Sequence, residues 1–328
     1  MKRFPRPATL LAALLVVGLT LPAVASPLVY PVPSEDGFPL DTSPPQVTAS
    51  SWILYDESSD VVLAEWDADT RRPMASITKI MTVLLALERG DLDEEVTVSA
   101  EAAGQGGQEI GLVAGETVEL GALVRAAMVR SGNDAAAAIA EHIGGSIEGF
   151  VELMNERAAE LGMTNTHFVN PHGLDANGHY SSARDMLTVG RAAMAMPEFV
   201  DIARSRVMVF PDTPDGTQRS ATNTNRILNS YRGVIGIKTG ETPNAGLTYV
   251  GAAERDGRRL FAVVFRSVGT RAHFADAIAL YEWAFHDLQI QGTLSRGCPT
   301  NRSPHGCRPR RCSSRRAWRA TSTPPPRG

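Results

Sequence analysis

Two short motifs contain every lysine that follows the first few residues. The chain has 32 lysines and arginines together, and only Lys2, Lys79 and Lys238 are lysines. Arginine keeps its proton in a protein, whereas burial and nearby charge can make a lysine neutral. Lys79 ends the segment S-I-T-K at 76–79, and Lys238 begins K-T-G at 238–240. A chain that uses arginine for its surface cations therefore keeps lysine where a titratable amine could do chemistry.

Ser76 and Lys79 are spaced as a nucleophile and its base. Residues three apart at the start of a helix place their side chains on one face. A serine hydroxyl attacks poorly unless a base within hydrogen-bonding distance takes its proton. Lys79 can be that base only when neutral, so its pKa must fall from about 10.4 to near 7, a bias of about 4–5 kcal/mol against the ammonium. Burial and a second cation would supply this bias, and Lys238 is the candidate cation.

A third motif, Ser131-Gly132-Asn133, lies between the other two. It could simply be the connection between two helices, with Asn133 or Asp134 capping the second helix. It could also point side chains into a cleft. Ser131 would then relay a proton to the leaving amine, and Asn133 would hold the substrate amide or Lys79.

The K-T-G motif is expected at the end of a strand. Lys238 offers charge for a substrate carboxylate, and Thr239 offers a hydroxyl donor. Gly240 lets a backbone ligand approach closely, because it has no Cβ. Each motif alone is weak evidence. The ordered set S-x-x-K, S-x-N and K-T-G is the signature of serine acyltransferases and hydrolases that recognise penicillin.

One early hairpin and three late strands, with helices between them, must position these motifs. Apolar spacing predicts helices over 76–89, 120–130, 134–143, 150–161 and 271–288, and alternation predicts strands at 51–56, 61–66, 234–238, 246–253 and 260–268. The hairpin and the late strands are expected to share one sheet, on which the helices pack. This predicts a single α+β (mixed α/β) domain over about residues 48–290.

The two ends of the chain differ from this domain. Residues 1–25 combine a basic start, an apolar run and a small-x-small cleavage pattern, which predicts a secretory signal peptide; the alternative is an uncleaved membrane anchor. Residues 26–47 are Pro-rich and predict an extended linker. Residues 291–328 form a basic low-complexity tail that we expect to be disordered; the alternatives are an arm for anionic envelope polymer and out-of-frame translation.

Charge and cysteine content limit the classes of molecule that the protein is expected to bind. Twelve of the cations lie outside residues 26–287, so that segment carries a net charge of −16. An acidic body argues against nucleic acid as the partner, because phosphate binding needs a basic face. All three cysteines lie in the tail, at 298, 307 and 312, in no trusted metal-binding pattern. We expect no metal and no organic cofactor.

Over nearly all of residues 48–290, the chain resembles a known family. The family is the low-molecular-weight penicillin-binding proteins, specifically the serine-type D-alanyl-D-alanine carboxypeptidases. Besides the three motifs, segments 73–82, 170–174 and 182–186 are similar to blocks typical of that family. The resemblance implies a β-lactamase/transpeptidase-like domain with an antiparallel sheet and helices packed on it.

The resemblance also implies a reaction outside the cytoplasm, in the cell envelope. Ser76 would be acylated by the penultimate D-Ala of a peptidoglycan stem peptide ending in D-Ala-D-Ala. Terminal D-Ala would leave, and water would then free the shortened peptide. The oxyanion would lie between the backbone N–H groups of Ser76 and Glu241, each such donor contributing roughly 3–4 kcal/mol. β-Lactam antibiotics would inhibit by acylating the same serine.

Some features depart from the family pattern or leave a choice open. The Glu241 carboxylate lies beside the expected site of a substrate carboxylate, so its side chain should point away. The family often has a cation near the start of the last helix, which either Arg271 or His273 could supply. His172 is interpreted as structural rather than as a base. Only the basic tail follows residue 290, where the family tends to have a β domain and a membrane anchor, so membrane association stays open.

Three other functions remain as alternatives. A class A β-lactamase uses a Glu in an E-x-x-L-N segment for deacylation, and no such pattern lies between Asn133 and Lys238. Penicillin should therefore inhibit this protein rather than be turned over. A β-lactam or peptidoglycan-binding module would be acylated without turning over peptide, as a sensor or a cell-wall anchor. A sensor of this kind would need a transmembrane relay, and none is visible in the sequence. A transpeptidase of this kind usually carries large added domains.

Overall fold

Alternating apolar residues build a six-stranded sheet that is covered on both faces. The structure, a computed structural model, describes residues 28–29 and 43–287. The strand order is β1-β3-β2-β10-β9-β8, and every neighbouring pair is antiparallel. Its strands are β1 (Leu28–Val29), β2 (Ser51–Asp56), β3 (Val61–Trp66), β8 (Val234–Thr242), β9 (Gly246–Arg255) and β10 (Arg258–Ser267). The prediction that the early hairpin and the three late strands share one sheet is confirmed.

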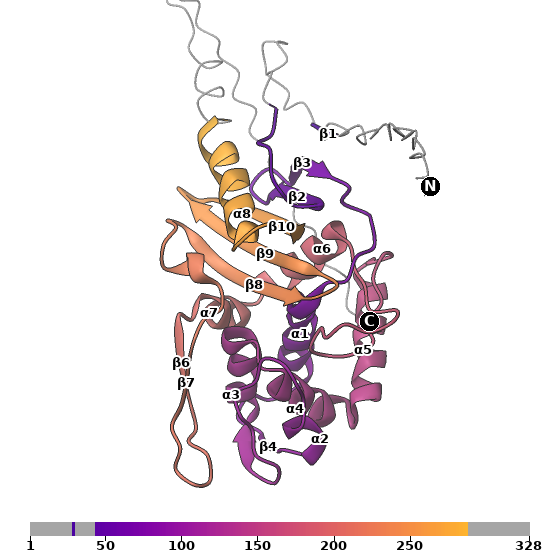
Figure 1. Ribbon diagram of the computed structural model, residues 1–328, viewed down its shortest axis with the longest axis vertical. Coiled ribbons are helices and arrows are strands. Elements are labelled where there is room, and N and C mark those ends of the chain that lie inside the picture. The colour runs from indigo at the N-terminus through magenta and orange to yellow at the C-terminus, as the bar shows by residue number, and fades with distance from the viewer. Residues whose placement is uncertain (1–27, 30–42, 288–328) are drawn as a thin grey trace, which may run out of the picture.

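Strand β10 shows how the two faces form. Leu260, Ala262 and Val264 belong to the core on one face, whereas Phe261 and Val263 belong to the core on the other. Successive side chains of a strand point to opposite faces, so a continuous apolar run fits a strand that is buried on both sides. Helix α8 (Ala272–Glu282), continued by η4 (Trp283–Asp287), covers the first face (Figure 1).

The opposite face carries the larger helical part of the fold. Helices α6 and α7 pack on this face of the sheet, and α1 packs against both of them and against α4 and α5. The elements of this part are η1 (Ala75–Thr78), α1 (Lys79–Arg89), α2 (Ala100–Ala103), α3 (Leu120–Arg125), η2 (Ala126–Arg130), α4 (Asn133–Gly144), α5 (Ile147–Glu160), α6 (Ala183–Met194) and α7 (Pro197–Arg204). The short helix η3 (Arg226–Leu228) belongs to the first face, because Ile227 and Leu228 share the core of α8. The predicted α+β architecture and its antiparallel sheet are therefore confirmed.

Several local features differ from the sequence predictions. Strand β8 continues to Thr242, so the K-T-G motif lies within the strand and the prediction that it ends there is wrong. Leu28–Val29 pairs with β3, inside the segment predicted to be a linker. Two small two-stranded sheets were not predicted: β4 (Glu95–Thr97) with β5 (Thr117–Glu119), and β6 (Val207–Phe210) with β7 (Arg219–Thr222).

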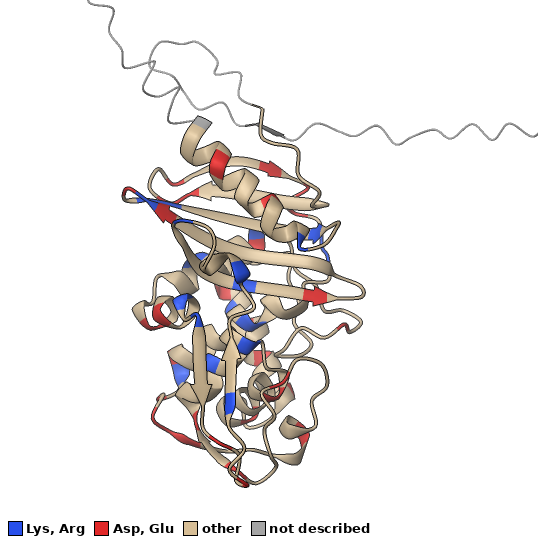
Figure 2. Ribbon diagram, turned by 60° about the vertical axis from the view of Figure 1, so that its left-hand side comes forward, with Lys and Arg blue, Asp and Glu red and all other residues tan. Residues whose placement is uncertain are grey.

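The remaining predictions for the chain ends lie outside the described residues. These are the signal peptide at 1–25, most of the linker and the tail at 291–328 with its cysteines. Within the described part of the chain, no helix has the length and apolar character to cross a membrane. Both signs of charge are spread over the fold, and several Lys and Arg positions lie in its middle, where sheet and helices meet (Figure 2).

Candidate active site

Ser76 lies in a strained turn where the helical part meets the sheet. The residue before it, Ala75, has φ of 54°, in the left-handed region that costs a non-glycine residue about 1–2 kcal/mol. Thr78 Oγ1 donates to the carbonyl oxygen of Ala75 over 2.8 Å. Gly173 lies so close that a Cβ there would be 2.0 Å from the same oxygen. The neighbours thus hold Ala75 in this conformation, as is common at functional sites.

Lys79 begins α1, and its side chain is fully buried. Its Nζ lies 3.1 Å from Ser76 Oγ, 2.7 Å from Asn133 Oδ1 and 2.6 Å from the carbonyl oxygen of His172. A neutral amine has two N–H donors and one lone pair. If Asn133 and His172 accept the two N–H bonds, the lone pair points at the Ser76 hydroxyl. The arrangement is that of a base held against its nucleophile.

Electrostatics favour the neutral form of Lys79. Burial lowers the pKa of Lys79 well below its usual value, and the charge of Lys238 lowers it further. The Asp134 carboxylate acts in the opposite direction. The expectation that Lys238 provides a second cation for Lys79 therefore has the correct sign, although burial is the larger cause.

The Ser131-Gly132-Asn133 motif follows the π-helical turn η2. Ser131 has φ of 68°, and its side chain lines the cleft beside Ser76. Gly132 is the N-cap residue of α4, so the prediction that Asn133 or Asp134 caps this helix is wrong. Asn133 Nδ2 donates to the Gly106 carbonyl oxygen over 2.6 Å, which leaves Oδ1 for Lys79. Of the two proposed partners of Asn133, the structure thus shows Lys79.

The K-T-G motif lies on β8 against the nucleophile segment. Burial lowers the pKa of Lys238 to about 7, and its Nζ donates to the Thr239 carbonyl oxygen over 3.1 Å. Thr239 Oγ1 donates to Thr224 Oγ1 over 2.8 Å. A Cβ on Gly240 would lie 2.8 Å from the backbone nitrogen of Ser76. The close approach that Gly240 permits is therefore that of the chain's own nucleophile segment.

A cleft of about 410 Å³ opens over these motifs. It is lined by residues that lie far apart in the chain: Ser76, Gln108, Ser131, Thr224, Arg226, Thr239, Gly240, Glu241, Leu247, Arg271, His273 and Phe274. Lys79, Asn133 and Lys238 are buried beneath it. All eight sequence-predicted site residues thus gather in or under one cleft.

Both candidates for the additional cation line this cleft. Arg271 is exposed. His273 is buried, and burial lowers its pKa to about 4, so it is neutral at pH 7. Arg271 is therefore the cation of the two. His172 is also neutral, since burial and the Lys79 charge lower its pKa to about 3, and it contributes its backbone carbonyl to Lys79. Its interpretation as structural fits this placement.

The sequence analysis missed Gln108, Thr224 and Arg226. Gln108 follows two glycines in a loop, and Thr224 lies in the segment N-T-N at 223–225. Glycine pairs and Asn-rich segments commonly form turns, so neither signal pointed to a cleft. Among the described residues, no cluster of His, Cys, Asp or Glu side chains could hold a metal ion.

Replacing Lys238 by methionine should stabilise the fold near neutral pH. In the unfolded chain this lysine has a pKa of about 10.4, against about 7 in the folded state. Between these values the unfolded state binds more protons, so the contribution of this group to stability rises with pH. We expect Lys238→Met to be more stable than the wild type at about pH 6, by about 1–3 kcal/mol, with the difference shrinking toward about pH 10.

Urea unfolding at the two pH values measures this effect. The matched control is Arg271→Met, which removes an exposed cation and should change stability by less than about 0.5 kcal/mol. A Lys238→Met variant less stable than the wild type at the lower pH would contradict the expectation.

Comparison with known proteins agrees with this geometry. D-alanyl-D-alanine carboxypeptidase DacC of Escherichia coli is 37% identical over 254 residues, which cover 74% of this chain and 62% of DacC. DacF of Bacillus subtilis is 34% identical over 253 residues, covering 76% and 65%. The chain therefore spans less than two thirds of the length of these two curated relatives.

Two solved structures match over nearly their whole length. A DD-transpeptidase of Streptomyces superposes with a TM-score of 0.70 at 30% identity, covering 74% of this chain and 99% of the other. A D-alanyl-D-alanine carboxypeptidase of Mycobacterium tuberculosis superposes with a TM-score of 0.71 at 34% identity, covering 74% and 93%. The sequence profile of the D-alanyl-D-alanine carboxypeptidases matches residues 39–268. The chain thus belongs to the D-alanyl-D-alanine carboxypeptidase family.

Proposed function

We propose that this protein is a serine D-Ala-D-Ala carboxypeptidase acting through an acyl-enzyme on Ser76. The observation that carries the proposal is the environment of Lys79: a fully buried amine 3.1 Å from Ser76 Oγ, with Asn133 and His172 as its other partners. The substrate would be a peptidoglycan stem peptide ending in D-Ala-D-Ala, and β-lactams would be covalent inhibitors. Family membership and the naming of DacC and DacF support this assignment.

In the proposed first step, Lys79 removes the proton of Ser76 Oγ as that oxygen attacks the penultimate D-Ala carbonyl. The Ser76–carbonyl bond forms, and negative charge develops on the carbonyl oxygen. The backbone N–H groups of Ser76 and Glu241 would stabilise this oxyanion. The peptide bond to the terminal D-Ala then breaks, and its nitrogen receives, through Ser131, the proton that Lys79 took from Ser76. Ser131 lines the cleft beside Ser76, as this role requires.

The K-T-G segment and its neighbours would recognise the substrate. Thr239 lines the cleft, and its hydroxyl would turn from Thr224 to donate to the terminal carboxylate, while Lys238 supplies charge from beneath. Arg271 adds an exposed cation at the cleft. The Asn133 amide makes hydrogen bonds to Lys79 and to the Gly106 carbonyl oxygen. Its main role would therefore be to hold the base, Lys79, in position rather than to bind the substrate. In the second step water attacks the acyl-enzyme and regenerates Ser76.

The molecule that accepts the acyl group in that second step distinguishes a carboxypeptidase from a transpeptidase. A carboxypeptidase transfers the acyl group to water, whereas a transpeptidase transfers it to an amine. The match to a Streptomyces DD-transpeptidase over 99% of that chain makes the second outcome worth testing. Among the described residues that line the cleft, Glu241 is the one carboxylate, and it is exposed. This supports slow hydrolysis of the penicilloyl-enzyme rather than β-lactamase activity.

Incubating the purified protein with an acyl-D-Ala-D-Ala peptide tests the proposal. We expect release of free D-Ala, and a penicillin adduct that mass spectrometry locates on Ser76. The Ser76→Ala variant should show neither. Added amine acceptors, such as glycine, should divert little product. Penicillin hydrolysis as fast as D-Ala release, or an adduct on another serine, would contradict the proposal, and predominant transfer to the amine would indicate a transpeptidase.

The proposed location is the cell envelope, outside the cytoplasm. The substrate class places the reaction there, and the signal-like residues 1–25 support it.

A further inference from the structure

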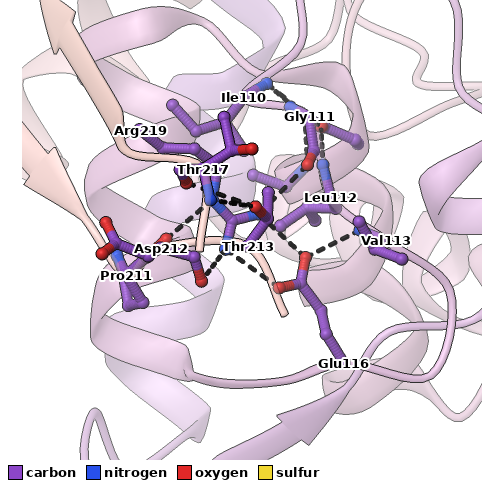
Figure 3. Close-up of polar contacts among 12 residues, drawn as sticks. Ile110, Gly111, Leu112, Val113, Glu116, Pro211, Asp212, Thr213, Thr217 and Arg219 are labelled. Carbon is purple, nitrogen blue, oxygen red and sulfur yellow. Dashed lines mark hydrogen bonds and ion pairs between the residues drawn. The ribbon is translucent and has the colours of Figure 1, made fainter. Parts of the chain in front are cut away.

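A buried ion pair joins the β6–β7 hairpin to the loop between α2 and β5, which covers residues 104–116 (Figure 3). Arg219 on β7 and Glu116 in the loop are each 5% exposed. Arg219 Nη1 donates to Glu116 Oε1, and Nη2 donates to Oε2, both over 2.9 Å. Neither residue lines the cleft above Ser76.

The Arg219 guanidinium has an acceptor for each of its five N–H groups. Besides the two bonds to Glu116, it donates to backbone oxygens on both sides of the junction: Pro211 (2.7 Å), Asp212 (3.2 Å) and Gly111 (3.0 Å). Glu116 Oε1 also accepts from the backbone N–H of Val113 over 2.7 Å. A planar guanidinium with fixed donor directions holds its partners in one geometry (Figure 3).

The same loop contacts the active site at its other side. The carbonyl oxygens of Gln108 and Gly106 accept from the Asn133 backbone N–H and from Asn133 Nδ2, each over 2.6 Å. The Asp134 carboxylate accepts from the backbone N–H groups of Ile110, Gly111 and Leu112. Asn133 in turn contacts Lys79 Nζ. The position of the loop therefore determines where the amide beside the base lies.

The hairpin also continues into the opposite wall of the cleft. Two residues after β7, the Thr224 backbone N–H donates to the Val129 carbonyl oxygen over 3.1 Å. Thr224 Oγ1 accepts from Thr239 Oγ1, on the K-T-G strand. The Arg219–Glu116 pair thus connects the loop that holds Asn133 with the segment that holds Thr239.

We propose that Arg219 and Glu116 are positioning residues for acylation, which fix the loop so that Asn133 holds Lys79 against Ser76. This inference rests on the proposed function. A buried ion pair is weak evidence for stability, because apolar residues of similar size often replace one at no loss. What apolar residues cannot replace is the set of directed bonds to Gly111 and to the hairpin backbone.

Two variants separate positioning from stability. Arg219→Lys keeps the charge but cannot make the five bonds, and Glu116→Leu/Arg219→Met replaces the pair by apolar side chains that should preserve the fold. Stopped-flow acylation by a fluorescent penicillin gives the limiting rate and the half-saturating concentration separately. In both variants we expect the limiting rate to fall by roughly 10–100-fold, because small misplacements of catalytic groups cost about that much. The half-saturating concentration should change little.

Arg258→Lys is the matched control. Arg258 makes a half-buried ion pair with Asp56 and a bond to the Ala284 carbonyl oxygen, at the far end of the sheet strands from the K-T-G motif. It should keep the wild-type acylation rate. A folded double variant with the wild-type limiting rate would overturn the inference, as would a change confined to the half-saturating concentration. A wild-type protein that penicillin does not acylate would instead overturn the proposed function, so the two failures are distinguishable.

Discussion

Replacing Lys79 by arginine should reduce acylation of Ser76 by about 10³-fold or more, since general-base catalysis contributes about 10²–10⁴-fold and arginine keeps its proton. Lys79 donates to Asn133 Oδ1 and to the His172 carbonyl oxygen, which leaves its lone pair for Ser76. A guanidinium has no lone pair to offer. Acylation by a fluorescent penicillin and release of D-Ala measure the loss.

Two further measurements show whether a slower reaction comes from loss of the base or from loss of the fold. Lys79→Met, which has neither charge nor base, should be as slow as Lys79→Arg if the base is what matters. Thermal unfolding of each variant shows whether the fold persists. If Lys79→Arg were acylated within about tenfold of the wild-type rate, a positive charge rather than a neutral amine would be assisting the attack.

Lys79 and Lys238 together determine how the acylation rate depends on pH. The charge of Lys238 is one cause of the lowered Lys79 pKa, and Asp134 opposes it. Lys238 itself has a pKa of about 7. Acylation should fall toward acidic pH as Lys79 is protonated and the base is lost. In Lys238→Met the pKa of Lys79 should rise, so the acidic limb of the acylation profile should move to higher pH.

Periodicity was sufficient to predict the outline of the fold. Apolar residues alternate in the sequences of the late strands. In the helix that carries Lys79, the apolar residues Ile80, Leu84 and Leu87 recur at helical spacing. Element ends were less certain. Strand β8 continues through Gly240 and Glu241, residues with low strand preference, because β9 pairs with it as far as Thr242. Tertiary pairing outweighed local preference there.

The chemical groups of the site were predictable, but the residues that place them were not. Residue type and spacing identified Ser76 and Lys79. The left-handed Ala75 depends on Gly173, almost a hundred residues away in the chain, and no local pattern contains that contact. Arg219 and Glu116 are likewise ordinary charged residues in the sequence, and only their burial against each other distinguishes them.

Replacing Gly240 by alanine should abolish most activity, although glycine touches no substrate group through a side chain. A Cβ there would lie 2.5 Å from Thr248 Oγ1 and 2.8 Å from the Ser76 backbone nitrogen. Heavy atoms cannot approach so closely, and Ala75 is already held by its neighbours. The Ser76 N–H and the strand must therefore separate, which displaces a proposed oxyanion donor. We expect acylation to fall by about 10²–10³-fold, as for loss of one such donor.

The control must lose similar stability without touching the site. Gly257, in the turn between β9 and β10, has φ of 77° and no heavy atom within 4 Å of a built Cβ. Gly257→Ala should therefore cost about 1–2 kcal/mol of backbone strain and leave the acylation rate unchanged. Measuring unfolding and acylation for both variants separates strain from misplacement. If Gly240→Ala were acylated within about threefold of the wild-type rate, the Ser76 N–H would not be the donor whose position limits the reaction.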